Sequence, residues 1–299
     1  MTGHFLDIAG MRLHDLEFPG GPPTLVCLPG LSATAPIFED LIVTGLGGAY
    51  RTIALDLRGR GLSDAPPAGM DPADPAANYR MADHAGDVLD LLDRREIGRA
   101  VLVGHSFGGM LAFFLGAHHP ERFPRLVVLD AAISVASPET REVLAPMLAR
   151  LGAVVPSWDA YLAAVKNLPY LQGRWNDSLE RYFRSYVNIA ADGSVRQRVD
   201  RPAIRAAVEG ILAEDWPSLV RTIRQPCLLI NATEPYGPAG SPPFLTEAGA
   251  RATVALMPDC RYRAVGGNHI TMVFGDHAGD VAAAIREFLG EDPAPVTVD

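Results

Sequence analysis

Residues 100–118 read AVLVGHSFGGMLAFFLGAH and carry the strongest indication of the fold. The apolar run at 100–103 has the composition of a strand buried on both faces, and 107–118 has the composition of a buried helix. Between them, Gly104-His105-Ser106-Phe107-Gly108 matches the GxSxG motif. The motif glycines carry no Cβ, so they let a strand and a helix approach closely around a strained serine. The stretch therefore predicts a sharp strand-to-helix turn that presents Ser106 as a nucleophile.

On either side of this turn, short apolar runs alternate with longer helix-like stretches. The apolar runs are 24–28, 51–55, 100–103, 125–129, 227–230 and 262–265, and the helices between them include 81–95, 107–118 and 276–289. Residues 4–8 and 12–17, with a turn at Gly10, predict an antiparallel hairpin at one edge. This order is typical of an α/β fold with a mostly parallel central sheet and helices on both of its faces.

The alternation stops between residues 134 and 224. Four helix-like stretches follow there, at about 137–151, 158–168, 176–190 and 201–213, with no convincing strand. We therefore expect a core formed by residues 1–133 and 225–299 and a helical cap formed by residues 134–224. Most of the large aromatic side chains of this cap are expected to form its own core, and a few to face a pocket beneath it. The tail from Glu291 is expected to fray.

A serine nucleophile needs a base beside it, because its hydroxyl is a poor nucleophile at neutral pH. His269 is the best placed of the eight histidines, since it follows Gly266-Gly267-Asn268 between the last apolar run and the final helix. A loop at the carboxyl end of a strand can reach the nucleophile turn across the sheet. The sequence therefore predicts His269 as the general base.

Four segments in this order resemble the α/β-hydrolase family. They are Pro29-Gly30-Leu31, the DLRGRGLSD stretch at 56–64, the GxSxG turn and the His269 loop. The resemblance implies an oxyanion hole formed by the backbone N–H groups of Leu31 and Phe107. It also implies a structural role for 56–64. Many members have His where this chain has Pro29, a change that affects the support of the hole more than the hole itself.

The carboxylate that orients His269 has two candidates. The family most often places its acid after the strand that follows the cap, near Glu234, but the common frame falls on Pro235, which cannot serve. Some members carry the acid one strand earlier, where this chain has Asp130 directly after an apolar run. A carboxylate there would face the same rim as Ser106 and could hold the correct tautomer of His269. We predict Asp130 as the acid and keep Glu234 as the alternative.

These residues predict hydrolysis of a small to medium, mostly hydrophobic carboxylic ester or lactone through an acyl-enzyme on Ser106. Carbon–carbon bond hydrolysis, amide hydrolysis and cofactor-free peroxidation would use the same residues, and a non-catalytic ligand sensor or a scaffold is a further alternative. Serine as nucleophile argues against epoxide hydrolase and haloalkane dehalogenase activity. Arg174, Arg181 and Arg184 could bind a substrate carboxylate, although solvated surface positions are the simpler interpretation.

Composition also limits the partners, the location and the cofactors that we expect for this protein. The chain has 299 residues and a formal net charge of −9, which argues against nucleic acid as a partner. Its first residues lack a secretory signal, and no run of apolar residues could span a bilayer, so we expect a cytoplasmic protein without a membrane partner. The three cysteines, Cys27, Cys227 and Cys260, are expected to be free thiols. No metal or cofactor is predicted, the expected partner is a small-molecule substrate, and monomer and homodimer both remain open.

Overall fold

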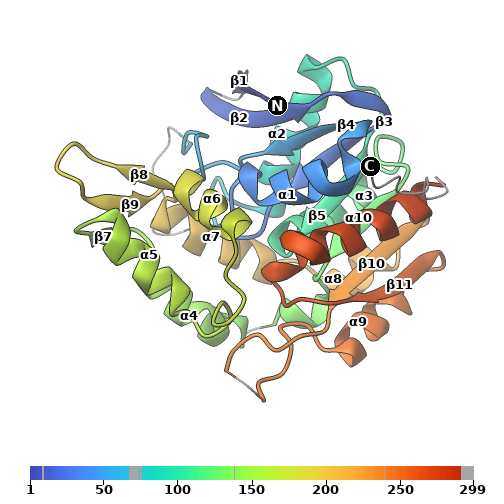
Figure 1. Ribbon diagram of the computed structural model, residues 1–299. Coiled ribbons are helices and arrows are strands. Elements are labelled where there is room, and N and C mark those ends of the chain that lie inside the picture. Colours follow the sequence, from blue (N-terminus) through green and yellow to red (C-terminus); the bar gives the residue numbers. More distant parts are fainter. Residues whose placement is uncertain (9, 67–73, 75, 138, 239, 291–299) are drawn as a thin grey trace, which may run out of the picture.

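The computed structural model describes residues 1–8, 10–66, 74, 76–137, 139–238 and 240–290, so the expectation for the tail from Glu291 lies outside the described residues. The core is an eight-stranded sheet with the order β1-β2-β4-β3-β5-β6-β10-β11 (Figure 1). From β4 to β11 neighbouring strands are parallel, whereas β1, β2 and β4 pair antiparallel. The strands are β1 (Thr2–Ile8), β2 (Met11–Phe18), β3 (Gly20–Leu28), β4 (Gly48–Leu55), β5 (Val101–His105), β6 (Leu126–Leu129), β10 (Cys227–Ala232) and β11 (Cys260–Val265).

This sheet confirms the α/β fold and the edge hairpin that the sequence predicted. Each predicted apolar run overlaps one of the strands. β5 continues beyond the predicted end at residue 103, because Gly104 pairs with Leu28 on one side and His105 pairs with Leu129 on the other. The added pairing carries the strand up to Ser106.

Helices cover both faces of the sheet. Figure 1 shows α1 (Glu39–Leu41) and α10 (Gly275–Leu289) on the near face, with α2 (Met81–Arg94) and α3 (Phe107–His118) behind the sheet. The helices at 81–95, 107–118 and 276–289 are thereby confirmed to within a residue at each end. The sequence analysis missed the helical turns at 35–46 and α9 (Glu247–Val254).

The segment between β6 and β10 is an insertion, which we define as residues 134–224. In Figure 1 it gathers to one side of the sheet. Its elements are α4 (Thr140–Arg150), β7 (Val154–Val155), α5 (Trp158–Lys166), α6 (Asp177–Ser185), β8 (Val187–Ile189), β9 (Val195–Gln197), α7 (Arg201–Leu212) and α8 (Trp216–Val220).

The expectation that this insertion contains no strand is wrong. β7, β9 and β8 form a small antiparallel sheet, and the helix expected at 176–190 ends at Ser185. A turn with Gly193 at a φ of 83° joins β8 to β9, a conformation that favours glycine. Strands of two or three residues are too short to produce an alternation of apolar and polar side chains that a sequence pattern can reveal.

The parallel strands end at one edge of the sheet. Leu28, Leu55, His105, Leu129 and Val265 are the last residues of β3, β4, β5, β6 and β11. Loops at the carboxyl ends of parallel strands form the usual ligand site of such sheets. Among the described residues, the helices are too short or too polar to cross a membrane.

Candidate active site

Ser106 occupies the sharp turn between β5 and α3. Its φ is 54° and its ψ is −116°, a conformation that side-chain-bearing residues rarely adopt. A Cβ on Gly104 would overlap the backbone of Gly108, and a Cβ on Gly108 would overlap the carbonyl group of Leu28. The two glycines therefore allow the close contact of strand and helix that holds Ser106 in this conformation.

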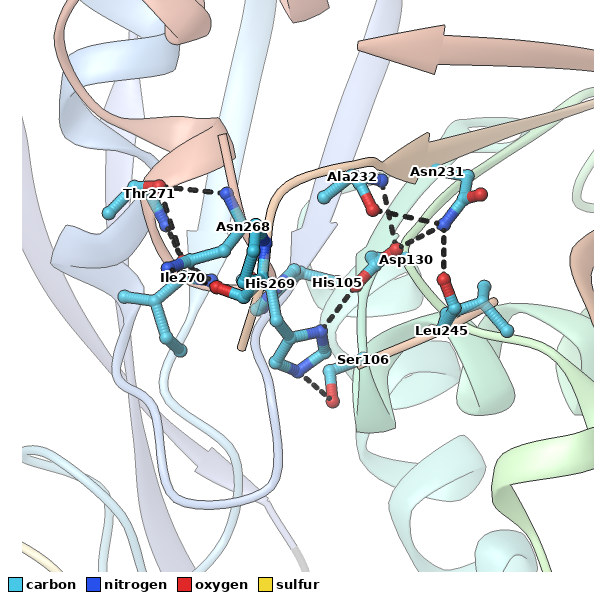
Figure 2. Close-up of polar contacts among 11 residues, drawn as sticks. His105, Ser106, Asp130, Asn231, Ala232, Leu245, Asn268, His269, Ile270 and Thr271 are labelled. Atoms are coloured by element: carbon cyan, nitrogen blue, oxygen red, sulfur yellow. Dashed lines mark hydrogen bonds and ion pairs between the residues drawn. The ribbon is translucent and has the colours of Figure 1, made fainter. Parts of the chain in front are cut away.

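His269 lies between Ser106 and Asp130 (Figure 2). The Ser106 hydroxyl donates to Nε2 of His269 over 3.0 Å, and Nδ1–H of His269 donates to Oδ2 of Asp130 over 2.7 Å. This pattern requires the neutral tautomer of His269 with its proton on Nδ1. The imidazole is 6% exposed and Asp130 is fully buried, so solvent competes little for these bonds.

Asp130 directly follows β6 and is held from its far side by β10. Its Oδ1 accepts hydrogen bonds from Nδ2 of Asn231 and from the backbone N–H of Ala232, each of 2.9 Å. Its backbone N–H donates to the carbonyl of Ile230 over 2.7 Å. These contacts satisfy the buried carboxylate and fix the direction in which Oδ2 faces His269.

Asn231 was not singled out by the sequence analysis. Its position in the sequence was the available signal, because Asn231 directly follows the apolar run 227–230 as Asp130 follows the run 125–129. In the structure β6 and β10 are parallel neighbours, and Leu129 pairs with Ile230. That register places the residues that follow, Asp130 and Asn231, side by side at the edge of the sheet.

Glu234, the alternative acid, has other partners. Its Oε1 accepts the backbone N–H of Gly267 over 3.1 Å, and its Oε2 accepts Nε of Arg174 over 3.1 Å. Burial raises the pKa of Glu234, but the hydrogen bonds from Gly267 and Arg174 outweigh that effect and hold the pKa below its ordinary value. Of the two candidate acids, Asp130 is the one whose carboxylate hydrogen-bonds Nδ1 of His269.

Leu31 and Phe107 flank Ser106 from two different elements. Leu31 lies in the loop after β3, next to Gly30, and Phe107 is the first residue of α3. Within the described part of the chain, neither backbone N–H has a hydrogen-bond acceptor. Both N–H groups therefore lack a protein acceptor there, as the predicted oxyanion hole requires.

The loop that carries His269 is held by its neighbours. Nε2–H of His105 donates to the carbonyl oxygen of His269 over 2.7 Å. Burial lowers the pKa of His105 to about 3, so this ring is neutral at physiological pH. The side-chain oxygen of Asn268 accepts the N–H groups of Ile270 and Thr271, each over 3.0 Å, and its amide donates to the carbonyl of Tyr170 over 2.7 Å.

A pocket of about 450 Å³ lies next to Ser106. Most of its lining is apolar and comes from the insertion and from the loops of the core; examples are Leu144, Val165, Phe183 and Phe244. Tyrosine hydroxyls and Gln197 add polarity, and Arg150 is the one arginine or lysine of this lining. Sequence analysis missed Arg150, because a basic residue at the end of a helix usually interacts with solvent and the helix dipole.

The three arginines considered from the sequence are not among the residues that line this pocket. Arg174 pairs with Glu234, Arg181 pairs with Asp40, and Arg184 stacks over the ring of Trp158. As for metals, no cluster of three His, Cys, Asp or Glu side chains with suitable geometry is found in the ranges that the structure describes.

Known proteins share this architecture. 2-(Acetamidomethylene)succinate hydrolase of Mesorhizobium japonicum is 26% identical over 265 residues, which cover 86% of each chain. 2-Hydroxymuconate semialdehyde hydrolase of a Pseudomonas species is 29% identical over 297 residues, covering 98% of this chain and 95% of that one. A crystal structure of E-2-(acetamidomethylene)succinate hydrolase matches with a TM-score of 0.75 at 25% identity, over 97% of this chain and 99% of that chain.

The family model described as the alpha/beta hydrolase fold matches residues 23–276, which include most of β3, all of β4 to β11 and every predicted site residue. The chain belongs to the alpha/beta hydrolase fold family and is, by that membership, a hydrolase.

Proposed function

We propose that this chain is a serine hydrolase that cleaves a carboxylic ester or lactone through an acyl-enzyme on Ser106. The observation that carries the proposal is the continuous hydrogen-bonded series from Ser106 through His269 to Asp130 beside a largely apolar pocket. A serine, a base and an orienting carboxylate in this order are the parts that nucleophilic acyl transfer needs.

In the proposed first step, Nε2 of His269 takes the hydroxyl proton while Oγ of Ser106 attacks the carbonyl carbon. The carbonyl oxygen becomes an oxyanion that accepts hydrogen bonds from the N–H groups of Leu31 and Phe107. As the tetrahedral intermediate collapses, His269 gives its proton to the leaving alcohol. Asp130 keeps the ring oriented and stabilises it while it carries the positive charge.

In the second step, water replaces the alcohol. His269 removes a proton from the water molecule as the water oxygen attacks the acyl carbon. The N–H groups of Leu31 and Phe107 bind the second oxyanion. Collapse of that intermediate breaks the bond to Ser106 Oγ, which regains its proton from His269. The acid product leaves, and the free enzyme is restored without a metal or a cofactor.

The pocket favours an acyl group that is mostly apolar and carries one carboxylate. Its lining is largely hydrophobic, and Arg150 provides a positive charge. Burial raises the pKa of Tyr170 and of Tyr236, and the nearby Arg150 cation partly offsets that rise. The two tyrosine rings stack with centroids 4.6 Å apart, and both residues line the pocket together with Arg150. A cation with two phenolic donors suits a carboxylate.

The relatives favour a second candidate, hydrolysis of an amide or a carbon–carbon bond in a carboxylated substrate. Their names, 2-(acetamidomethylene)succinate hydrolase and 2-hydroxymuconate semialdehyde hydrolase, both contain a carboxylic acid, and the first contains an amide. We propose that the insertion serves as the cap over the substrate in either case, since it supplies lining residues such as Leu144 and Tyr161.

A substrate panel tests the proposal. It comprises p-nitrophenyl butyrate, p-nitrophenyl hydrogen glutarate, a γ-lactone, an N-acetyl enamine of a dicarboxylic acid and a β-diketone acid. We expect the highest kcat/KM for an ester or lactone, with the carboxylated ester preferred over the neutral one. Faster turnover of the enamide or of the diketone would favour the second candidate. No turnover of any compound by protein with an intact fold would support a ligand sensor instead.

A further inference from the structure

Arg60 is a buried cation behind the proposed oxyanion hole. It belongs to the 56–64 stretch, and only 1% of its surface is exposed. Its Nε–H donates to the carbonyl oxygen of Leu31 over 2.7 Å, and its guanidinium carbon lies 5.2 Å from the ring centroid of Phe107. A single side chain therefore contacts both residues whose N–H groups would bind the oxyanion.

In the part of the chain that the structure describes, the charge of Arg60 has no direct counterion. Its Nη1–H donates to the carbonyl of Arg58 over 2.7 Å, and within the described residues its Nη2 has no hydrogen-bond partner and no carboxylate lies within 4.0 Å of the guanidinium. Burial lowers the pKa of Arg60 to about 10, which leaves it protonated at neutral pH. A buried charge without a counterion is costly to the fold, so packing alone does not explain this residue.

Arg58, two residues earlier in the same stretch, differs from Arg60 because a carboxylate pairs with its guanidinium. Its guanidinium forms two hydrogen bonds with Asp87, of 2.6 and 2.7 Å, and donates to the carbonyls of Asn78 and Asp83. Its charge is thus neutralised within the fold. Arg58 is a structural residue, as the resemblance implies for this stretch, whereas the positive charge of Arg60 remains available to a nearby anion.

The backbone around Arg60 is fixed by the insertion. Gly61 N–H donates to the carbonyl of Arg198 over 2.7 Å, and the N–H of Asp200 donates to the carbonyl of Gly59 over 3.0 Å. Arg60 itself forms an antiparallel bridge with Val199. These contacts with residues 198–200 therefore fix the backbone from which the Arg60 side chain reaches Leu31.

We propose that Arg60 is a positioning residue of the oxyanion hole, which orients Leu31 and Phe107 and adds a buried positive charge behind the developing oxyanion. This inference rests on the proposed function. Because the oxyanion exists only in the tetrahedral states, removal of the charge should lower kcat and weaken binding of tetrahedral analogues while it leaves substrate binding nearly unchanged.

The test measures kcat, KM and inhibition by phenylboronic acid for wild type, Arg60→Met and Arg60→Lys with p-nitrophenyl butyrate. For Arg60→Met we expect kcat to fall roughly tenfold to hundredfold, the inhibition constant of the boronic acid to rise by a similar factor, and KM to stay within about twofold. Lysine restores the charge but not the planar contacts, so Arg60→Lys should lie between Arg60→Met and wild type.

The matched control is Arg95→Met. Arg95 is also largely buried, but it pairs with Asp15 and Glu17 on β2, away from Ser106. The Arg95→Met protein should have a lower thermal stability than wild type but the same kcat and the same inhibition constant for phenylboronic acid. The inference is wrong if folded Arg60→Met keeps both kcat and the inhibition constant within about twofold of wild type. If Ser106→Ala retains turnover in the same assay, the proposed function has failed instead. If Arg60→Met does not fold, Arg60→Gln takes its place, with the same expected losses and the same criterion.

Discussion

Nδ1–H of His269 donates to Asp130 Oδ2 over 2.7 Å, and the other oxygen of Asp130 accepts hydrogen bonds from Asn231 and Ala232. The carboxylate therefore has a fixed orientation before a substrate arrives. A fixed carboxylate selects the tautomer of His269 in which Nε2 is free to accept the Ser106 proton.

The first prediction concerns the acid. In Asp130→Asn an amide group faces Nδ1 of His269 and favours the wrong tautomer, so kcat should fall by about 10⁴. Glu234→Gln is the control, because a glutamine can still accept the N–H of Gly267 that Glu234 accepts. It should change kcat by less than about threefold, as expected for a residue outside the reacting groups. Steady-state kinetics with an ester substrate measures both. The assignment is wrong if Asp130→Asn stays near wild type and Glu234→Gln loses the activity.

The second prediction concerns backbone strain at Ser106. Ser106 has a φ of 54°, which glycine adopts at little cost. Ser106→Gly should abolish turnover and raise the free energy of unfolding by about 1 kcal/mol, because the strain relieved exceeds the extra chain entropy of glycine. Urea denaturation followed by circular dichroism gives the comparison. A Ser106→Gly protein less stable than wild type would show that the turn stores no strain.

The third prediction is a pH dependence of stability. Burial lowers the pKa of His105 from 6.5 to about 3. Above pH 6.5 neither the folded nor the unfolded chain binds a proton at this ring. Between pH 6.5 and about 3 only the unfolded chain does, so the free energy of unfolding falls by about 1.4 kcal/mol for each unit of decreasing pH.

The variant His105→Asn removes the titrating imidazole and keeps a side-chain donor for the carbonyl of His269. Between pH 8 and pH 5, wild type should lose about 2 kcal/mol more unfolding free energy than the variant does. Urea titrations at the two pH values measure the difference. Equal losses in both proteins would mean that His105 binds a proton in the folded state.

The fourth prediction concerns substrate charge. Arg150→Gln should raise KM for p-nitrophenyl hydrogen glutarate by roughly tenfold to hundredfold, since a hydrogen bond between charged groups contributes about 1.5–3 kcal/mol. KM for neutral p-nitrophenyl butyrate should stay unchanged. Arg184→Gln is the control, because Arg184 stacks over Trp158 and does not line the pocket. An equal rise in KM for both esters would exclude a specific contact with the carboxylate.

Much of the fold could be predicted from the sequence because its main elements have strong local patterns. The strand and helix around Ser106 are continuous apolar runs joined by glycines, and the predicted bounds of α3 are those observed. The loop of His269 was recognised because glycines precede it at the end of an apolar run. Asp130 was favoured because it directly follows a buried strand and because the resemblance allows an acid at that position, while the common acid position falls on Pro235.

The remaining features depend on contacts between distant residues. β8 and β9 are too short for a periodic pattern, and their pairing is an outcome of folding. Arg60 and Arg58 are chemically identical in the sequence, yet one is neutralised by Asp87 and the other contacts Leu31. Arg150 and Tyr170 of the insertion line the same pocket as Tyr236, which lies in a loop of the core. No local sequence pattern predicts this arrangement.

If Ser106 is an activated nucleophile, as we propose, the folded protein should react covalently at this residue. A fluorophosphonate probe should add to the folded wild-type protein with a stoichiometry near one, and mass spectrometry of the digest should place the adduct on Ser106. Ser106→Ala should remain unlabelled, and His269→Ala should react far more slowly. If the folded wild-type protein takes up no probe, or carries it on another residue while Ser106 stays unmodified, Ser106 is not an activated nucleophile.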